Sequence, residues 1–308
     1  MSTRHRLLTR PDFDGLVCAV LLRELDLIDD IQFVHPKDMQ DGLIPVSDRD
    51  ITANLPFVAG VHLAIDHHAS EATRVADQSS FVLDASAPSA ARVVWNHFGG
   101  KSRFPTISEE MMAAVDKADS ADYGIEEIMA PEGWPLLNFI IDPRTGLGRF
   151  RHFATPTDQL LKDLIVHCRN PSIKEILELP DIKERVLFYF DQAERAEAQI
   201  IRCAQHHRHI TVLDLRAEEI IHPCNRFLMY ALFPECSVSI HEMWGPRKEK
   251  TVFAVGKSVL NRSSKTKIGD LMLEHGGGGH DAAGTCQVAN DTADAVLKQL
   301  IDRMLKDG

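Results

Sequence analysis

The stretch Val-His-Leu-Ala-Ile-Asp-His-His, residues 61–68, decides the fold class of this chain. Its apolar first half predicts a β-strand, and Asp66, His67 and His68 follow at the carboxyl end of that strand. Open α/β sheets carry their ligand-binding groups at the carboxyl ends of the strands. The stretch therefore predicts one carboxylate and two imidazoles at the functional edge of such a sheet, although three polar residues after a strand are also typical of a solvated turn.

A second strand end carries two more carboxylates. Leu-Leu-Thr, residues 7–9, leads into Arg10 and then into Asp12 and Asp14, which are followed by a glycine. A largely apolar helix pattern over residues 16–27 and a strand pattern over residues 31–35 complete a β-α-β order, which is typical of a parallel sheet. Carboxylates mixed with imidazole suit Mn²⁺ or a similar divalent ion, so the two strand ends together predict a metal site.

A glycine run lies near the other end of the chain. Residues 276–279 are four glycines, His280 follows them, and Ala-Ala-Gly occupies residues 282–284. Glycines adopt backbone angles closed to other residues, and their N–H groups can surround an anion such as phosphate. A flexible linker is the alternative, but the run stands between a helical and a strand pattern, which favours a phosphate-binding loop.

With Asp-x-Asp-Gly, Asp-His-His and Gly-Gly-Gly-His in this order over nearly the whole chain, the sequence resembles the DHH/DHHA1 phosphoesterases. The resemblance implies an N-terminal doubly wound, mainly parallel sheet, the DHH domain, and a smaller C-terminal α/β DHHA1 domain, with the active site in the cleft between them. It also implies that two Mn²⁺ ions activate a water that attacks phosphorus.

The resemblance assigns roles to individual residues. Asp119 is taken as the fourth-motif aspartate, with Asp116 and Asp122 as alternates. The predicted metal ligands are Asp12, Asp14, Asn54, His67 and Asp119. The predicted catalytic group is Asp66, His67, His68 and Arg10. The predicted substrate contacts are His68, Arg262, Gly277, Gly278, Gly279 and His280.

Two positions depart from the family pattern. Arg10 and Leu8 stand where the family has a metal-binding histidine, and Asn54 stands where it has an aspartate that bridges both metals. A neutral amide is a weaker bridging ligand than a carboxylate, so the site's capacity for two cations falls unless Asp50 serves instead. Arg10 binds phosphate well in principle, and its guanidinium is predicted to replace part of the missing metal charge.

Bulk properties limit the class of protein. A length of 308 residues with 44% hydrophobic and 26% charged residues predicts an ordinary globular chain of two domains. The helical pattern over residues 157–205 reads as a connector, and we place the predicted boundary within it, giving a DHH domain over 1–195 and a DHHA1 domain over 196–308.

Net charge and cysteine spacing limit partners and compartment. A formal charge of −11 argues against binding a long nucleic acid, because such proteins concentrate Lys and Arg. The sequence has neither a signal-like start nor a long apolar run, and its six cysteines lack metal-site spacing, which together predict a cytoplasmic protein without a membrane partner. Family habit adds a homodimer as an expectation.

The sequence thus predicts a metal-dependent phosphohydrolase that cleaves a short oligonucleotide, a cyclic dinucleotide or polyphosphate. The predicted cofactor is Mn²⁺, as one or two ions, with Mg²⁺ or Co²⁺ as alternatives. The competing hypothesis, motivated by Arg10 and Asn54, is a catalytically weakened protein that binds a phosphate-containing ligand as a sensor or partner.

Overall fold

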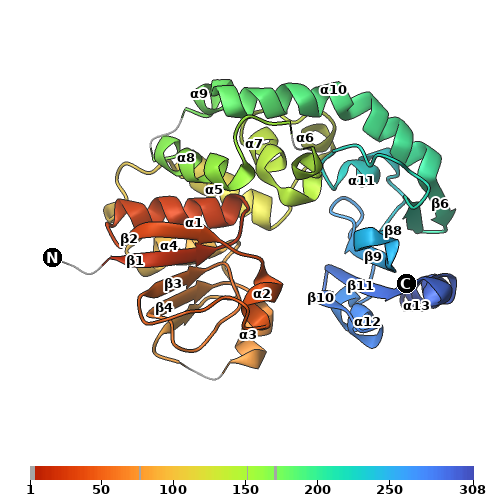
Figure 1. Cartoon of the computed structure of the whole chain (residues 1–308), viewed down its shortest axis with the longest axis horizontal. Coiled ribbons are helices and arrows are strands. Elements are labelled where there is room, and N and C mark those ends of the chain that lie inside the picture. The colour runs from red at the N-terminus through yellow and green to blue at the C-terminus, as the bar shows by residue number, and fades with distance from the viewer. Residues whose placement is uncertain (1–3, 76–77, 151, 170–171) are drawn as a thin grey trace. The chain divides into compact units, whose positions relative to one another are not determined.

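A five-stranded, fully parallel sheet organises the first part of the computed structural model, which describes residues 4–75, 78–150, 152–169 and 172–308 (Figure 1). The strand order β2-β1-β3-β4-β5 confirms the predicted open α/β sheet. The strands are β1 (His5–Thr9), β2 (Ile28–Phe33), β3 (Asp50–Ala53), β4 (Leu63–Asp66) and β5 (Phe81–Leu83).

Two helices cover this sheet near the site. α1 (Phe13–Glu24) is apolar on nearly all sides, so it is buried between β1 and its helical neighbours. α4 (Ala90–His97) contacts β4, β5 and α1, and its N-cap residue is Ser89, whose hydroxyl accepts the N–H of Arg92. The predicted helix at 16–27 therefore exists, and it begins three residues earlier, at Phe13.

Further helices complete this part of the chain. Ser108 caps α5 (Glu109–Asp119), where its hydroxyl accepts the N–H of Met111 at 3.3 Å. The other short and long helices are α2 (Pro36–Gln40), α3 (Ala69–Arg74), η1 (Gly100–Ser102), α7 (Gly133–Ile141), η2 (Pro143–Thr145), η3 (Leu147–Arg149), α8 (Thr157–His167) and α9 (Ile173–Glu178).

A six-stranded mixed sheet forms the second part, in the order β10-β11-β9-β8-β7-β6. Its apolar core lies between the sheet and the two helices α12 and α13. The strands are β6 (Ala204–His207), β7 (Ile210–Asp214), β8 (Val238–Trp244), β9 (Lys250–Lys257), β10 (Gly278–His280) and β11 (Ala283–Ala289). The helices are α6 (Ile125–Met129), α11 (Leu228–Leu232), η4 (Pro246–Lys248), α12 (Ile268–Glu274), η5 (Asn290–Thr292) and α13 (Ala293–Asp307).

The glycine run corrects one prediction. Gly278 to His280 form the edge strand β10, paired with β11, where the sequence predicted a loop. A Cβ at Gly277 would stand 2.1 Å from the carbonyl oxygen of Thr285, and one at Gly279 would stand 2.3 Å from that of Ala283. Gly277 and Gly279 are therefore explained by close approach of backbones, which other residues do not permit.

The chain divides into two compact units. Unit 1 comprises residues 1–122 and 131–189, and unit 2 comprises residues 123–130 and 190–308. The change occurs inside the long helix α10 (Pro180–Cys203), green in Figure 1. The predicted boundary at residue 195 also lies in this helix and stays a prediction.

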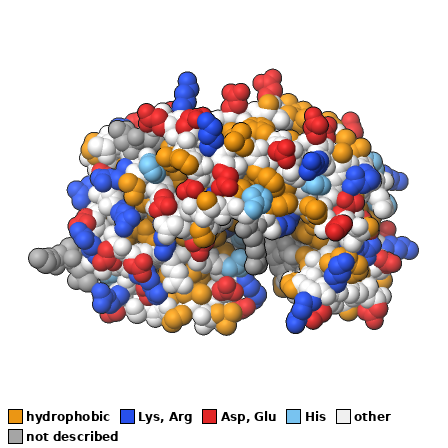
Figure 2. Space-filling view, turned by 45° about the horizontal axis from the view of Figure 1, so that its top comes forward, with side chains coloured by type: hydrophobic (Ala, Val, Ile, Leu, Met, Phe, Trp, Pro, Cys, Tyr) orange, Lys and Arg blue, Asp and Glu red, His pale blue; other side chains and the backbone are white. Residues whose placement is uncertain are grey.

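The surface carries charges of both signs. Figure 2 shows acidic and basic side chains interspersed over the face in view, with hydrophobic side chains between them. Among the helices of the described residues, none is long and apolar enough to cross a membrane.

Candidate active site

Asp14 is fixed by the start of another helix. It lies in the first turn of α1, and its two carboxylate oxygens accept the backbone N–H groups of Ala90 at 2.9 Å and Ala91 at 2.7 Å. These amides open α4, so they carry the partial positive charge of a helix N-terminus. Burial, followed by the charge of Asp119, nevertheless raises the pKa of Asp14 well above its usual value. Burial and the charge of Asp119 therefore outweigh the helix amides and the nearby His67, which act in the opposite direction.

His67 has the orientation of a metal-binding histidine. Its Nδ1 lies 3.2 Å from the carbonyl oxygen of Ala87, which fixes the ring and turns Nε2 toward Asp119 Oδ2 at 2.9 Å. A backbone carbonyl on one ring nitrogen is the usual support for a histidine that binds metal through the other. Burial lowers the pKa of His67, but the carboxylates of Asp119 and Asp14 outweigh burial and raise this pKa to about 9.

Asp14, His67 and Asp119 form one cluster. One ligand atom from each lies within 4.8 Å of the others, although the three residues come from α1, the end of β4 and the end of α5. Burial raises the pKa of Asp119, but the effect of His67 is larger and lowers this pKa overall. The cluster brings together two acids and an imidazole in a largely buried place, and these are three of the five metal ligands that the sequence predicted.

Asp12 and Asn54 lie beside each other at the neighbouring strand ends. The Asn54 amide nitrogen donates to Asp12 Oδ1 at 3.2 Å, and Arg10 Nε lies 3.0 Å from Asp12 Oδ2. Asn54 is fully buried and adopts a left-handed backbone with φ of 57°, which asparagine tolerates better than most residues. All three residues therefore lie at the predicted edge, with Arg10 pairing to Asp12.

Asp66 and His68 form a second small group. Asp66 is 1% exposed, and its Oδ1 lies 2.7 Å from His68 Nδ1, which fixes that ring. Together with His67 these residues also bring three ligand atoms within 4.8 Å of one another.

Unpartnered polar atoms are concentrated at this edge. Three buried atoms here, Asn54 Oδ1, Asp66 Oδ2 and His67 Nε2, have no hydrogen-bond partner within the described chain, and the contact of His67 with Asp119 is an ion pair outside hydrogen-bond geometry. Buried polar groups are normally satisfied, so three orphans in one place indicate a missing partner. Two oxygens and an imidazole nitrogen fit a divalent cation.

The structure places the alternates away from this cluster. Asp50, at the amino end of β3, binds Arg6 at 2.7 Å, so it lies at the opposite edge from Asp66. Asp116 accepts Ser89 Oγ at 2.7 Å and Arg92 Nε at 2.9 Å instead of joining the cluster. Asp122 is exposed beyond the end of α5. Of the predicted acids, Asp119 is the one that reaches His67.

Arg144 is a site residue that the sequence did not single out. It lies in η2, where its Nε donates to Asp142 Oδ1 at 2.8 Å. Desolvation lowers the pKa of the Arg144 guanidinium, but the charges of Asp142, Asp12 and Asp119 outweigh this effect and raise the pKa overall. Arg144 therefore interacts electrostatically with acids of the cluster. Arg144 lies outside every motif quoted from the sequence, so no sequence signal marked it.

The predicted substrate contacts of unit 2 lie on its surface. Arg262 is exposed, and its Nε donates to the Val259 carbonyl oxygen at 3.0 Å. His280 is exposed in β10, and the N–H of Gly277 donates to the Met272 carbonyl oxygen at 2.9 Å. The bond from Gly277 to α12 and the pairing of β10 with β11 thus use part of the backbone that was expected to surround an anion. The role of these residues in substrate binding stays a prediction.

Known structures resemble the chain to very different degrees. A pGpG-specific phosphodiesterase, PggH from Vibrio cholerae, is 53% identical over 99% of this chain and 100% of that one, with a TM-score of 0.84. RecJ in complex with Mn²⁺ from Thermus thermophilus is 14% identical over 98% of this chain and 52% of that one, with a TM-score of 0.49. CDC45 from Entamoeba histolytica is 8% identical over 97% and 95%, also with a TM-score of 0.49. No protein-family model and no curated protein matched the chain.

The first of these relatives decides the assignment, because more than half of its residues are identical along the full length of both chains. It agrees with the Asp-His-His and Asp-x-Asp-Gly motifs and with the parallel sheet that carries them. The chain belongs to the DHH family of phosphoesterases and is a hydrolase of the DHH type.

Proposed function

We propose that this protein hydrolyses pGpG, a small linear guanine dinucleotide, into two mononucleotides. The observation that carries the proposal is the 53% identity with a pGpG-specific phosphodiesterase across 99% of the chain. Substrate specificity depends on many contacts, and identity at this level over whole domains supports a shared substrate. Cyclic dinucleotides, other short oligonucleotides and polyphosphate are the substrates to compare with it.

The proposal requires divalent metal, and the residues present fit one. The cation would be held by Asp14, His67 and Asp119, whose ligand atoms already converge, with Asp12, Asn54 and Asp66 beside them. When bound, such an ion supplies Lewis-acid polarisation of phosphoryl oxygens and lowers the pKa of a water. Mixed carboxylate and imidazole ligands favour Mn²⁺, with Mg²⁺ or Co²⁺ as alternatives.

Other residues of the chain orient the groups of the proposed site and would neutralise negative charge on the phosphate. The α4 amides hold Asp14, and the Ala87 carbonyl group holds the His67 ring, so both groups are oriented before anything binds. Asp66 likewise fixes His68, which would donate to the phosphate as negative charge develops on its oxygens. Preorganised groups of this kind need no rearrangement during the reaction.

We expect two arginines, Arg10 and Arg144, to bind phosphate groups of the substrate. Arg10 pairs with Asp12, and Arg144 responds to the charge of Asp12 and Asp119. A guanidinium can bind two phosphate oxygens at once. We propose that Arg10 leaves Asp12 when metal and substrate bind and then contacts the scissile phosphate.

The presence of Asn54 favours a lower affinity for a second metal ion. Its amide nitrogen faces Asp12 without any negative charge of its own, so a bridging position there would hold two cations less tightly than a carboxylate would. A protein that binds nucleotide with weak turnover is the second candidate, and Asn54 is the observation that favours it.

A substrate panel tests the function. Metal-stripped protein is incubated with pGpG, other dinucleotides, cyclic dinucleotides, polyphosphate and bis-p-nitrophenyl phosphate while Mn²⁺ is titrated. The matched control is the double variant Asp66→Ala/His67→Ala. Turnover of pGpG above all others that appears with Mn²⁺ and disappears in the control is expected. Tight binding of pGpG without turnover would instead favour the second candidate.

A further inference from the structure

Asp142 and Arg144 form a local pair in unit 1. Asp142 is 5% exposed, and its Oδ1 accepts the backbone N–H of Arg144 at 2.8 Å and the Nε–H of the same residue at 2.8 Å. Its Oδ2 accepts the same Nε–H at 3.1 Å. The carboxylate also caps η2, which has Pro143 in its first turn. One buried group therefore fixes both the backbone and the side chain of Arg144.

The pair uses only part of the Arg144 guanidinium. Within the part of the chain that the structure describes, its terminal nitrogens Nη1 and Nη2 donate to no group, and its ion pair is with Asp142 alone. The Arg144 side chain is 46% exposed to solvent. The two terminal nitrogens are therefore accessible to a ligand, in an orientation that Asp142 fixes.

Another pair with the same spacing, Asp214 and Arg216 in unit 2, is used differently. The backbone N–H and the Nε–H of Arg216 also donate to Asp214, at 3.1 and 2.9 Å. In addition, its Nη2 donates to Asp214 at 2.9 Å, and its Nη1 pairs with the buried Glu242 at 2.8 Å. Carboxylates of the protein thus occupy both terminal nitrogens of Arg216. Of the two pairs, the one that contains Arg144 is the one that can accept a ligand.

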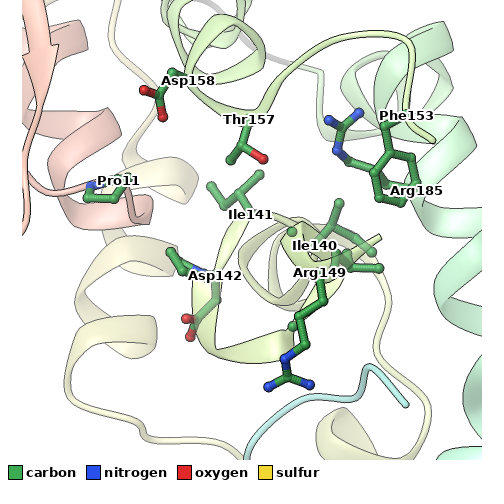
Figure 3. Close-up of a pocket in the computed structure, with 13 residues that line it drawn as sticks. Pro11, Ile140, Ile141, Asp142, Arg149, Phe153, Thr157, Asp158 and Arg185 are labelled. Carbon is green, nitrogen blue, oxygen red and sulfur yellow. The ribbon is translucent and has the colours of Figure 1, made fainter. Parts of the chain in front are cut away.

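The position of this pair connects it to the acids of the candidate metal site. Burial lowers the pKa of Arg144, but the charges of Asp142, Asp12 and Asp119 outweigh it and raise that pKa. Asp142 and Pro11, which directly precedes Asp12, line the same pocket, and Figure 3 shows both on the left of the view. A ligand on the Arg144 guanidinium would therefore lie close to the acid cluster.

The two arginines near these acids occupy different positions. Arg10 pairs directly with Asp12 at 3.0 Å, so it lies among the proposed metal ligands and suits the scissile phosphate. Arg144 is influenced by Asp12 and Asp119 but, among the described residues, forms an ion pair with neither, so it suits a phosphate beside the reacting one. In pGpG that second group is the terminal 5′-phosphate. A phosphate monoester carries more negative charge than the internal diester, and a guanidinium binds its oxygens bidentately.

We propose that Arg144, held by Asp142, binds the terminal 5′-phosphate of the substrate and thereby selects phosphorylated dinucleotides over unphosphorylated ones. Asp142 is then a positioning residue, which acts through Arg144 and does not itself bind the substrate. The identity of the dinucleotide rests on the proposed function. The contact would distinguish pGpG from GpG, which lacks the terminal phosphate.

Steady-state kinetics on pGpG and GpG tests Arg144. We expect the kcat/KM of the wild-type protein to be about tenfold or more higher for pGpG, mainly through a lower KM, because a site built to bind a group discriminates against a substrate without it. Arg144→Met should bring the ratio of the two kcat/KM values close to one. Arg144→Lys should restore part of the ratio, since a lysine binds phosphate as a point charge.

The matched control is Arg169→Met, which removes an exposed arginine that pairs with Glu24 in the same unit. This variant should keep the wild-type ratio of pGpG to GpG. A wild-type ratio near one, or an unchanged ratio in a folded Arg144→Met variant, overturns the proposal.

Asp142 is tested by combining its substitution with that of Arg144. Asp142→Ala should lower the ratio of pGpG to GpG severalfold, and Asp142→Asn, which keeps an oxygen acceptor, should lower it less. Because Asp142 acts through Arg144, the double variant Asp142→Ala/Arg144→Met should have the ratio of Arg144→Met alone. A merely structural role would lower stability and the turnover of both substrates without changing their ratio. An unchanged ratio in Asp142→Ala, or a double variant below Arg144→Met, contradicts the positioning role.

Failure of the proposed function would have a different signature. If the wild-type protein hydrolyses neither dinucleotide, the proposed function is refuted, and calorimetry with Mn²⁺ then gives the same comparison as a ratio of Kd values. Tighter binding of pGpG than of GpG that Arg144→Met abolishes would support the role of Arg144. Equal binding of the two dinucleotides, or binding of neither, would overturn it.

Discussion

The two edges of the parallel sheet in unit 1 carry similar side chains with opposite degrees of satisfaction. At the amino edge, Asp50 is 2% exposed, accepts Arg6 Nε at 2.7 Å on one oxygen, and accepts the Ser47 N–H at 2.6 Å on the other. At the carboxyl edge, Asp66 is 1% exposed, yet its Oδ2 has no hydrogen-bond partner within the described residues. Burial is the same at both edges, so the partners distinguish them.

The comparison separates an acid that the protein itself satisfies from an acid of the proposed metal site. Burial raises the pKa of Asp50, but Arg6 and Ser47 outweigh burial and lower this pKa overall. The Asp50 carboxylate is therefore stable as an anion without any ligand. Asp14, at the other edge, has its pKa raised by burial and by Asp119. An acid that the protein stabilises incompletely is one that a cation can stabilise.

The largest expected effect comes from the same substitution at the two edges. Asp14→Asn should lower kcat/KM by about a thousandfold, above the 10–100-fold typical of outer-shell groups of a metal site, because it would remove a charged ligand of the proposed metal site. Asp50→Asn should change kcat/KM by about twofold at most, but should cost about 2 kcal/mol of unfolding free energy by weakening its bond with Arg6. Steady-state kinetics and urea unfolding measure both. A similar kinetic loss in both variants would break the comparison.

Asn54 offers a second way to sharpen the contrast. Asn54→Asp should tighten Mn²⁺ binding by about tenfold, because ligand charge strengthens a cation site. Without metal the same variant should lose about 1–2 kcal/mol of stability, since the new carboxylate faces Asp12 in place of a donating amide. Calorimetric titration with Mn²⁺ and thermal unfolding in EDTA measure the two effects. Unchanged affinity would exclude residue 54 from the ligand set.

Much of this site was predictable because its motifs end strands. Parallel strands bring their carboxyl ends to one edge, so strand patterns at residues 7–9 and 61–65 suffice to bring Asp12 and His67 to the same side of a sheet. Asp119 follows from the family resemblance, and the structure confirms that it reaches His67 at 2.9 Å.

The remainder depended on packing that local patterns do not encode. The amides that hold Asp14 come from residues 76 and 77 positions away, at the start of α4, and any sequence can supply a backbone N–H. Gly279 misled in the other direction. Glycine is depleted in strands, but here β10 approaches β11 too closely for a Cβ, which becomes visible when both strands are placed.

Glu242, in β8 of unit 2, challenges the comparison because it is an unsatisfied acid far in sequence from the motifs. It is 1% exposed, neither oxygen has a hydrogen-bond partner in the described chain, and Arg216 lies 2.8 Å away as an ion pair. Burial, opposed by Arg216, raises its pKa from 4.5 to about 7. Incomplete satisfaction alone is thus insufficient to define a site, and convergence with other ligands is also needed.

The pH dependence of stability tests this reading of Glu242. Because its pKa is higher in the folded state, its protonated form favours folding, so its contribution is complete below pH 4.5 and is lost as the pH rises past about 7. Glu242→Gln removes the titration and should equal wild type near pH 4.5 but gain about 1–2 kcal/mol at pH 8. Urea unfolding across this range measures it, and a constant difference at all pH values would contradict the assignment.

The smallest expected effect concerns the support behind Asp14. Ser89 caps α4 and donates to Asp116 at 2.7 Å, and Arg92 donates to the same carboxylate at 2.9 Å, so this network holds the two amides that bind Asp14. Ser89→Ala should cost about 1 kcal/mol of stability through the lost cap and reduce kcat severalfold with KM nearly unchanged. Ser108→Ala removes the equivalent cap of α5 and should cost similar stability with less effect on kcat. Equal kinetic losses in the two cap variants would mean that stability alone, and not the placement of Asp14, limits turnover.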